Sequence, residues 1–162
     1  MKIILLLSLF IINSEYAFSQ PAYSNFTTTD LKGNPVMLDS LLNRGPVFIS
    51  FWATWCKPSK DQMKFMQSVY TKYKEQGFTY LAIAQDNHRS ISLIEPFVTS
   101  NKFTFPVILD SEKAIFYSYN SEEVPASFLI NSRKEVVFSS TGYTENDDKK
   151  IEDEIDKILL RR

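Results

Sequence analysis

Cys56 is the only cysteine in the sequence, and its surroundings favour a reactive sulfur. It follows the apolar run Val47–Trp52, which is typical of a strand buried on both faces, and it precedes a stretch with helical periodicity. A cysteine at the start of a helix meets free N–H groups and the positive end of the helix dipole, which favour the thiolate. Pro58 is compatible with a first helical turn, because that turn has no backbone donor to lose. The pattern therefore predicts a nucleophile at a strand-to-helix junction.

The residue three positions after Cys56 is Ser59, so the sequence has no second thiol for a Cys-x-x-Cys redox pair. A serine can donate a hydrogen bond to a thiolate, but it cannot attack a mixed disulfide. Any bond between Cys56 and a substrate sulfur must therefore be released by another thiol. Disulfide isomerisation, exchange with a small-molecule thiol and capture of a partner's cysteine all remain open. The structural alternative is that Cys56 is an inert apolar filler on an inactive scaffold.

Two short motifs carry a family resemblance. Residues 51–59 read FWATWCKPS, and residues 124–128 read VPASF. Both are similar to motifs of the thioredoxin fold, and the first resembles FWATWCxPC, the usual pattern of the secreted TlpA-like thiol–disulfide oxidoreductases. The resemblance runs roughly from Phe26 to the C-terminus. It implies an α/β three-layer sandwich with a mixed central sheet, helices on both faces and an N-terminal hairpin.

The resemblance also implies roles for individual residues. It places a cis bond before Pro125, facing Cys56, and it makes Cys56, Ser59 and Pro125 the catalytic set. A proline has no backbone N–H, so the backbone groups of Val124 are expected to pair with an extended substrate peptide, as in strand addition.

Other side chains near these residues are candidates for substrate contact. Trp55 matches one of the family's paired tryptophans and is expected to border the substrate groove, where an exposed ring offers apolar contact. Lys57 would favour the thiolate further if its ammonium approached the sulfur, and the alternative is a solvated lysine. Glu122 and Glu123 could select substrates by charge, although an ordinary solvated loop explains them as well.

Two further departures from the family pattern concern proton transfer. Thioredoxin itself has a buried aspartate where this chain has Ser50, and TlpA-like reductases often have a glutamate where it has Gln62. Either carboxylate would move protons while a second thiol releases the substrate. Together with Ser59, these residues indicate that the resolving half of the reaction is missing.

A peroxidase is a further possibility, because peroxiredoxins share this fold. Their cysteine follows the pattern P-x-x-x-T/S-x-x-C. Counting back from Cys56 places Ala53 where the hydroxyl should be and Ile49 where the proline should be. The sequence therefore argues against a peroxidase.

The remaining chain alternates between helical and strand patterns. After a hairpin with its turn at 32–34 and a helical turn at 39–43, strands are expected at 47–52, 78–84, 105–109, 126–130 and 135–141. Helices are expected from Cys56 to Gly77, from a capping box of Ser92 and Glu95 to about Asn101, over 111–119, and from near Glu145 to the end. This order predicts one domain with helices on both faces of a mixed sheet.

Residues 1–19 have the layout of a secretory signal peptide. Met1-Lys2 precedes the apolar run Ile3–Ile12, and Ala17-Phe18-Ser19 has small residues at both ends. A membrane span needs about 20 apolar residues, so a stable anchor is not expected. Cleavage would leave a thioredoxin-like domain at residues 20–162. The resemblance and the signal together suggest the bacterial periplasm.

Composition excludes several classes of function. The formal net charge is −1, with 18 basic and 19 acidic residues, which gives no reason to expect nucleic acid as a partner. One histidine and one cysteine leave no convincing zinc site, and no cofactor is expected. The expected partners are thiol- or disulfide-containing proteins or peptides, and an external thiol for recycling.

Two functions follow from these observations. In the first, an exported monothiol protein exchanges or isomerises disulfides through Cys56 without forming an internal disulfide. In the second, a redox-inactive thioredoxin-fold module of the cell envelope binds peptides, and Cys56 is dispensable. The intact motif around the thiol favours the first.

Overall fold

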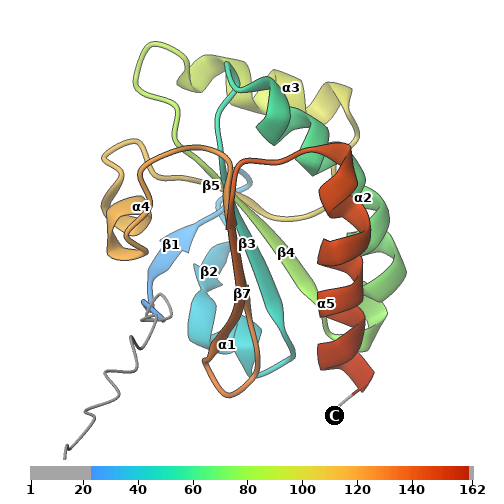
Figure 1. Cartoon of the computed structure of the whole chain (residues 1–162). Coiled ribbons are helices and arrows are strands. Elements are labelled where there is room, and N and C mark those ends of the chain that lie inside the picture. The colour runs from blue at the N-terminus through green and yellow to red at the C-terminus, as the bar shows by residue number, and fades with distance from the viewer. Residues whose placement is uncertain (1–22, 161–162) are drawn as a thin grey trace, which may run out of the picture.

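A computed structural model describes residues 23–160, so the predicted signal peptide lies outside the described residues. Five strands form one mixed sheet with helices on both faces, which confirms the predicted architecture (Figure 1). The strands are β3 (Val47–Trp52), β4 (Thr79–Ala84), β5 (Val107–Leu109), β6 (Ala126–Ile130) and β7 (Val136–Thr141), in the order β5-β4-β3-β6-β7. The central strand β3 pairs in parallel with β4 and antiparallel with β6.

The predicted N-terminal hairpin is also present. Strands β1 (Thr27–Thr29) and β2 (Pro35–Met37) pair antiparallel. Gly33, in the connecting turn, has a φ of 80°, a left-handed conformation that glycine adopts at little cost. The hairpin is tied to the main sheet by the backbone bond from Leu31 N to Val107 O, at 3.0 Å.

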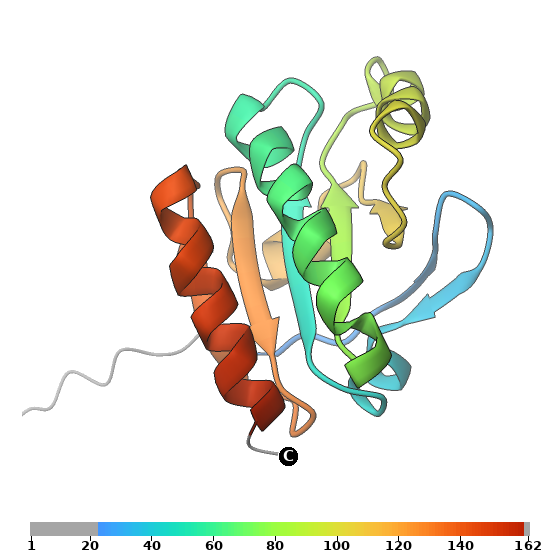
Figure 2. The same ribbon diagram turned by 90° about the vertical axis from the view of Figure 1, so that its right-hand side faces the viewer.

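The helices divide between the two faces of the sheet. They are α1 (Leu38–Leu42), α2 (Lys57–Tyr73), α3 (Ile94–Ser100), α4 (Ala114–Ser118) and α5 (Asp148–Leu160), with short 3-10 turns at Lys74–Gln76, Ile91–Leu93 and Glu145–Asp147. Helices α2 and α5 lie side by side across one face (Figure 2). Helices α1 and α4 lie on the other face with the hairpin (Figure 1).

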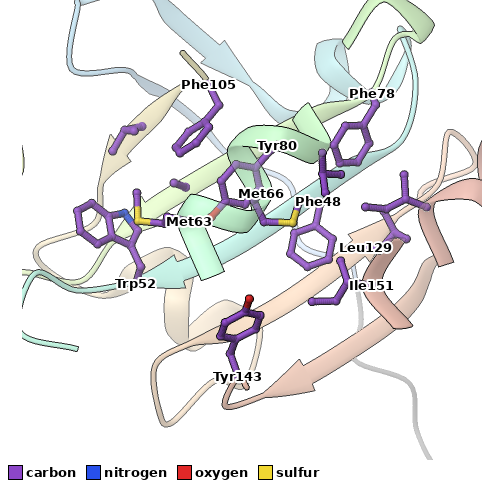
Figure 3. Close-up of a cluster of buried hydrophobic side chains, with 14 of the residues drawn as sticks. Phe48, Trp52, Met63, Met66, Phe78, Tyr80, Phe105, Leu129, Tyr143 and Ile151 are labelled. Carbon is purple, nitrogen blue, oxygen red and sulfur yellow. The ribbon is translucent and has the colours of Figure 1, made fainter. Parts of the chain in front are cut away.

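Alternate residues of β3 contribute to two separate cores, because successive side chains of a strand point to opposite faces. Phe48 and Trp52 belong to the core beneath α2, with Met63, Met66 and other residues labelled in Figure 3. Ile49 and Phe51 belong to the core on the opposite face. All six residues of β3 are buried, as its apolar sequence predicts.

Some element boundaries differ from the expectations. The capping box of Ser92 and Glu95 is wrong: Ser92 lies inside the 3-10 turn, and α3 begins at Ile94 without a side-chain cap. The helix expected from residue 111 begins at Ala114, because the Asp110 carboxylate accepts the backbone N–H groups of Ile115 and Phe116 and so fixes the helix start.

Candidate active site

Cys56 lies where the sequence predicts, at the junction between β3 and α2. Its N–H donates to the Ala53 carbonyl at 3.0 Å, and its own carbonyl accepts the Lys60 N–H at 3.2 Å. It is the N-cap residue of α2, with Pro58 in the first turn. Cys56 is 8% exposed, so the edge of this residue reaches the surface while most of it is covered. Cys56 makes no side-chain cap bond to α2, so none of the N–H groups at the helix start donates to its Sγ; they act on the thiol through the positive end of the helix dipole.

The bond between Val124 and Pro125 is cis and lies against Cys56, as the resemblance implies. Cys56 Sγ lies 3.3 Å from the Val124 carbonyl oxygen, to which the thiol can donate. These residues are 68 positions apart in the chain. They meet because β6, which begins just after Pro125, pairs with β3, which ends just before Cys56. The fold therefore brings the two sequence motifs into one site.

Ser59 is also in this region, but its hydroxyl is not bonded to the thiol. The residue is completely buried, and its Oγ has no hydrogen-bond partner among residues 23–160. A buried hydroxyl without a partner costs about 1–3 kcal/mol. The expectation that Ser59 stabilises the thiolate stays a prediction, since the structure shows the hydroxyl uncommitted.

Lys57 points to a neighbour on its own helix. Its Nζ lies 2.6 Å from Asp61 Oδ2, an i to i+4 ion pair, and its side chain is 84% exposed. The pairing with Asp61, by hydrogen bond and by charge, raises the pKa of Lys57 and lowers that of Asp61. The alternative of a solvated lysine therefore describes this side chain better than a charge held at the sulfur.

The two tryptophans of the motif differ in exposure. Trp52 is fully buried and packs on Phe97, with ring centroids 5.5 Å apart. Trp55 is 68% exposed, and with Val124 it lines a cavity next to the thiol. An exposed indole beside a reactive group provides apolar area for a bound molecule.

A buried polar cluster beneath α2 replaces the two carboxylates expected from the family pattern. Ser50 on β3 donates to Gln62 Oε1 at 2.5 Å, and Gln62 Nε2 donates to Ser127 Oγ on β6 at 3.0 Å. All three residues are completely buried. Ser50 and Ser127 are register partners on the two strands, so both side chains face α2. The sequence shows Ser50 and Gln62 in place of the two carboxylates, but it does not indicate that Gln62 also bonds to Ser127.

The adjacent Tyr80 keeps this region uncharged. It is fully buried, and burial raises the pKa of its phenol, with a smaller opposing effect from the Ser50 hydroxyl. The phenol is therefore protonated at neutral pH, and the groups under α2 form a neutral set.

Sequence reasoning missed one interaction that shapes the turn before Cys56. Asp86, just beyond β4, accepts the Thr54 N–H at 3.0 Å and the Thr54 hydroxyl at 2.5 Å. Asp86 is almost fully buried. The two residues are 32 positions apart, and only the parallel pairing of β3 with β4 brings their strand ends together. The peroxidase positions Ile49 and Ala53 are buried in this same segment and provide no hydroxyl.

Two other kinds of site receive no support from the described part of the chain. Between residues 23 and 160, no three His, Cys, Asp or Glu side chains are grouped so that they could hold a metal ion. Within the same range, no helix has the length and apolar character needed to cross a bilayer.

The sheet order, the cysteine at a helix start and the cis proline beside it define a thioredoxin-like fold. The chain belongs to the AhpC/TSA family, whose sequence profile matches residues 20–139. Among solved structures, a Chlorobium tepidum protein assigned as a thiol:disulfide interchange protein DsbE superposes with a TM-score of 0.78 at 25% identity, covering 86% of this chain and 96% of that one.

Relatives of known name are similar over most of this chain. Thiol-disulfide oxidoreductase ResA of Bacillus thuringiensis (strain Al Hakam) is 37% identical over 118 residues, which cover 73% of this chain and 66% of that protein. ResA of Geobacillus kaustophilus is 35% identical over 124 residues, covering 76% and 70%. The matched region thus spans about two thirds of the length of these two relatives.

Proposed function

We propose that this protein is an exported thiol–disulfide oxidoreductase of the ResA/DsbE type that works with one thiol, exchanging or isomerising disulfides through Cys56. The observation that carries the proposal is the approach of Cys56 Sγ to the Val124 carbonyl, 3.3 Å away, beside the cis bond to Pro125. The ResA relatives, named thiol-disulfide oxidoreductases, support the same chemistry.

In the proposed reaction, the Cys56 thiolate attacks one sulfur of a substrate disulfide. A bond forms between Cys56 and that sulfur, the original S–S bond breaks, and the second substrate sulfur leaves as a thiolate. In isomerisation, another thiolate of the same substrate attacks the mixed disulfide and releases Cys56. In exchange, an external thiol does so. Each step makes one S–S bond and breaks one, so the protein begins and ends with a free Cys56.

The surrounding residues have distinct parts in this proposal. The start of α2 stabilises the thiolate, and the Val124 backbone together with Pro125 aligns an extended peptide at the sulfur. Once Cys56 is ionised, its Sγ no longer donates to Val124 O and becomes an acceptor. The uncommitted Ser59 hydroxyl is then the donor that we assign to it.

The exported location is part of the same proposal. It is supported by the signal-like sequence of residues 1–19. In an oxidising compartment such as the periplasm, substrate disulfides persist, and a single-thiol protein can act on them. Detection of the chain in a periplasmic extract, with its N-terminus at residue 20, would test this point.

The central experiment is a trapping assay with scrambled, disulfide-containing ribonuclease. After acid quench and alkylation, mass spectrometry of the wild-type protein should show Cys56 bonded to a substrate peptide, and recovery of ribonuclease activity should accelerate. The Cys56→Ala variant should lose both, with its folding checked by circular dichroism. If wild type forms no mixed disulfide, or if Cys56→Ala retains substrate binding and biological effect, the peptide-binding module replaces the enzyme.

A further inference from the structure

A cavity beside the thiol has features that suggest which substrate side chain it receives. Its volume is about 280 Å³, and it is lined by Trp55, Gln85, Lys113, Phe116, Glu122, Glu123 and Val124. We call it the Trp55 pocket. Val124, whose carbonyl lies 3.3 Å from Cys56 Sγ, joins the pocket to the reactive sulfur. A residue close to the substrate cysteine can therefore place its side chain here.

Gln85 gives the pocket a buried hydrogen-bond acceptor without a partner. Its Nε2 donates to Asp110 Oδ2 at 3.2 Å, while Asp110 also accepts two backbone N–H groups at the start of α4. A carboxylate can only accept, so this contact fixes the orientation of the amide and leaves Oε1 as its free end. Gln85 is 4% exposed, and within the described chain its Oε1 accepts no hydrogen bond. A ligand with N–H groups would satisfy it.

The charges and rings around the pocket favour the same kind of ligand. Glu122 and Glu123 bring two carboxylates to its edge, and both residues are exposed. Lys113 is the one basic residue in the lining, and its Nζ lies 5.9 Å from the centre of the Phe116 ring. The exposed Trp55 ring offers the strongest kind of surface for a cation–π contact. The lining is thus acidic and aromatic, with a single opposing cation.

We propose that the Trp55 pocket selects substrates with a basic residue, arginine above all, next to the cysteine that Cys56 attacks. This deepens the proposed function and rests on it. The guanidinium stacks on Trp55 and donates to Glu122, Glu123 and, after a small rotation of the exposed side chains over it, to Gln85 Oε1. An acidic residue is repelled by the two carboxylates. An apolar residue leaves the Gln85 oxygen without a partner.

The test measures Cys56 exchange with short peptides that differ only at the residue beside cysteine: arginine, citrulline, leucine or glutamate. Each peptide is activated as its disulfide with 2-thiopyridine. The Cys56 thiolate attacks the peptide sulfur, the peptide–Cys56 disulfide forms, and the thiopyridine leaves and is followed by absorbance. Full-length wild type should react about fivefold to tenfold faster with the arginine peptide than with the glutamate peptide, and citrulline should fall between them.

The variants separate this proposal from a general effect of charge. In the double variant Glu122→Gln, Glu123→Gln, the preference for arginine over glutamate should fall below about twofold. Glu112→Gln removes one exposed negative charge from a residue outside the pocket, paired with His88 at 3.2 Å, and should leave the preference unchanged. Equal rates for all peptides in wild type, or an unaltered preference in the double variant, would overturn the proposal.

The neutral 2,2′-dipyridyl disulfide shows which idea has failed. It carries no side chain for the pocket, so its rate measures the reactivity of Cys56 alone. Rapid reaction with this reagent but no discrimination among peptides removes the Trp55 pocket and leaves the proposed function in place. Failure to react with it contradicts the proposed function itself.

Discussion

Helix α2 carries two groups of polar side chains whose hydrogen bonding differs sharply. Around its first turn, the polar groups have few hydrogen-bond partners. The Cys56 thiol can donate to the Val124 carbonyl, and the Ser59 hydroxyl has no partner within residues 23–160. One turn further, Gln62 lies between Ser50 and Ser127 and bonds to both. The hydrogen bonds of the first group can change during a reaction, whereas those of the second are already made. We call Cys56 and Ser59 the open pair, and Ser50, Gln62 and Ser127 the closed cluster.

The difference indicates what this site can and cannot do. A closed cluster of neutral groups holds α2 against β3 and β6 but has no carboxylate to pass a proton at neutral pH. The open pair keeps the geometry of a thiol at a helix start and lacks the thiol that would resolve it. Under the proposed function, Cys56 would form a mixed disulfide that this site, without a second cysteine, could not release alone.

Replacing Ser59 with cysteine should have the largest effect on this contrast. Position 59 lies one helical turn from Cys56, so the new thiol can attack a Cys56–substrate disulfide within the molecule. We expect Ser59→Cys to form an internal disulfide and to shorten the life of the mixed disulfide by on the order of a hundredfold or more. Quenched-flow trapping and mass spectrometry measure both.

The matched control is Ser68→Cys, which adds a thiol at an exposed position further along the same helix. It should leave the mixed-disulfide lifetime as in wild type, because residue 68 is more than three turns from Cys56. An unchanged lifetime in Ser59→Cys would mean that the geometry of a resolving site is not preserved.

Gln62→Glu tests the closed cluster by adding a carboxylate of nearly the same shape. Burial raises the pKa of that carboxyl above its unfolded value of about 4.3. Below about pH 4 this carboxyl is neutral in both the folded and the unfolded state, so the variant keeps its full stability there. The free energy of unfolding then falls as the pH rises through the folded-state pKa, because the buried carboxyl must ionise. We expect a loss of about 2–4 kcal/mol at pH 7, measured by urea unfolding across this pH range.

The control for that charge is Gln67→Glu, on the same helix at a partly exposed position. Gln67 Oε1 accepts the Thr104 N–H at 2.9 Å, and a carboxylate retains that contact. Gln67 Nε2 donates to the exposed Thr71 and Thr104 hydroxyls, which can rotate to donate to a carboxylate or to water instead. Its unfolding free energy should change by less than about 0.5 kcal/mol. Equal pH profiles for the two variants would show that the Gln62 site is not a closed, low-dielectric environment.

Serine-to-alanine changes compare the two groups directly. Ser127→Ala removes the partner of Gln62 Nε2 inside a fully buried cluster and should destabilise the fold by about 1–3 kcal/mol. Ser59→Ala removes a buried hydroxyl that bonds to nothing in the described chain, so stability should stay within about 0.5 kcal/mol or rise. Thermal and urea unfolding of both variants provide the measurement. A large loss in Ser59→Ala would mean that its hydroxyl is satisfied.

The sequence predicted local features of this arrangement well and distant contacts poorly. The nearly all-apolar run of β3 and the Cys56–Pro58 junction have strong local signals, and both occur as expected. The contact between Asp86 and Thr54 has no local signal, because it depends on how two parallel strands end. The failed capping box at Ser92 shows the converse: a correct local pattern yields to the 3-10 turn that precedes α3.

Lys57 has both a local sequence signal and a side-chain contact that the sequence does not indicate. Its substitution should have the smallest effect of those predicted. The sequence places it beside Cys56, yet side-chain direction decides its influence, and its ammonium pairs with Asp61 at 2.6 Å. Exposed ion pairs contribute about 0–1 kcal/mol, so Lys57→Gln should change the rate of Cys56 with a neutral disulfide by less than about fivefold. Asp61→Asn frees the ammonium and should raise that rate slightly more than Lys57→Gln lowers it. A fall of tenfold or more in Lys57→Gln would instead place its charge at the sulfur during the reaction, and the thiolate would then depend on this side chain as much as on the helix start.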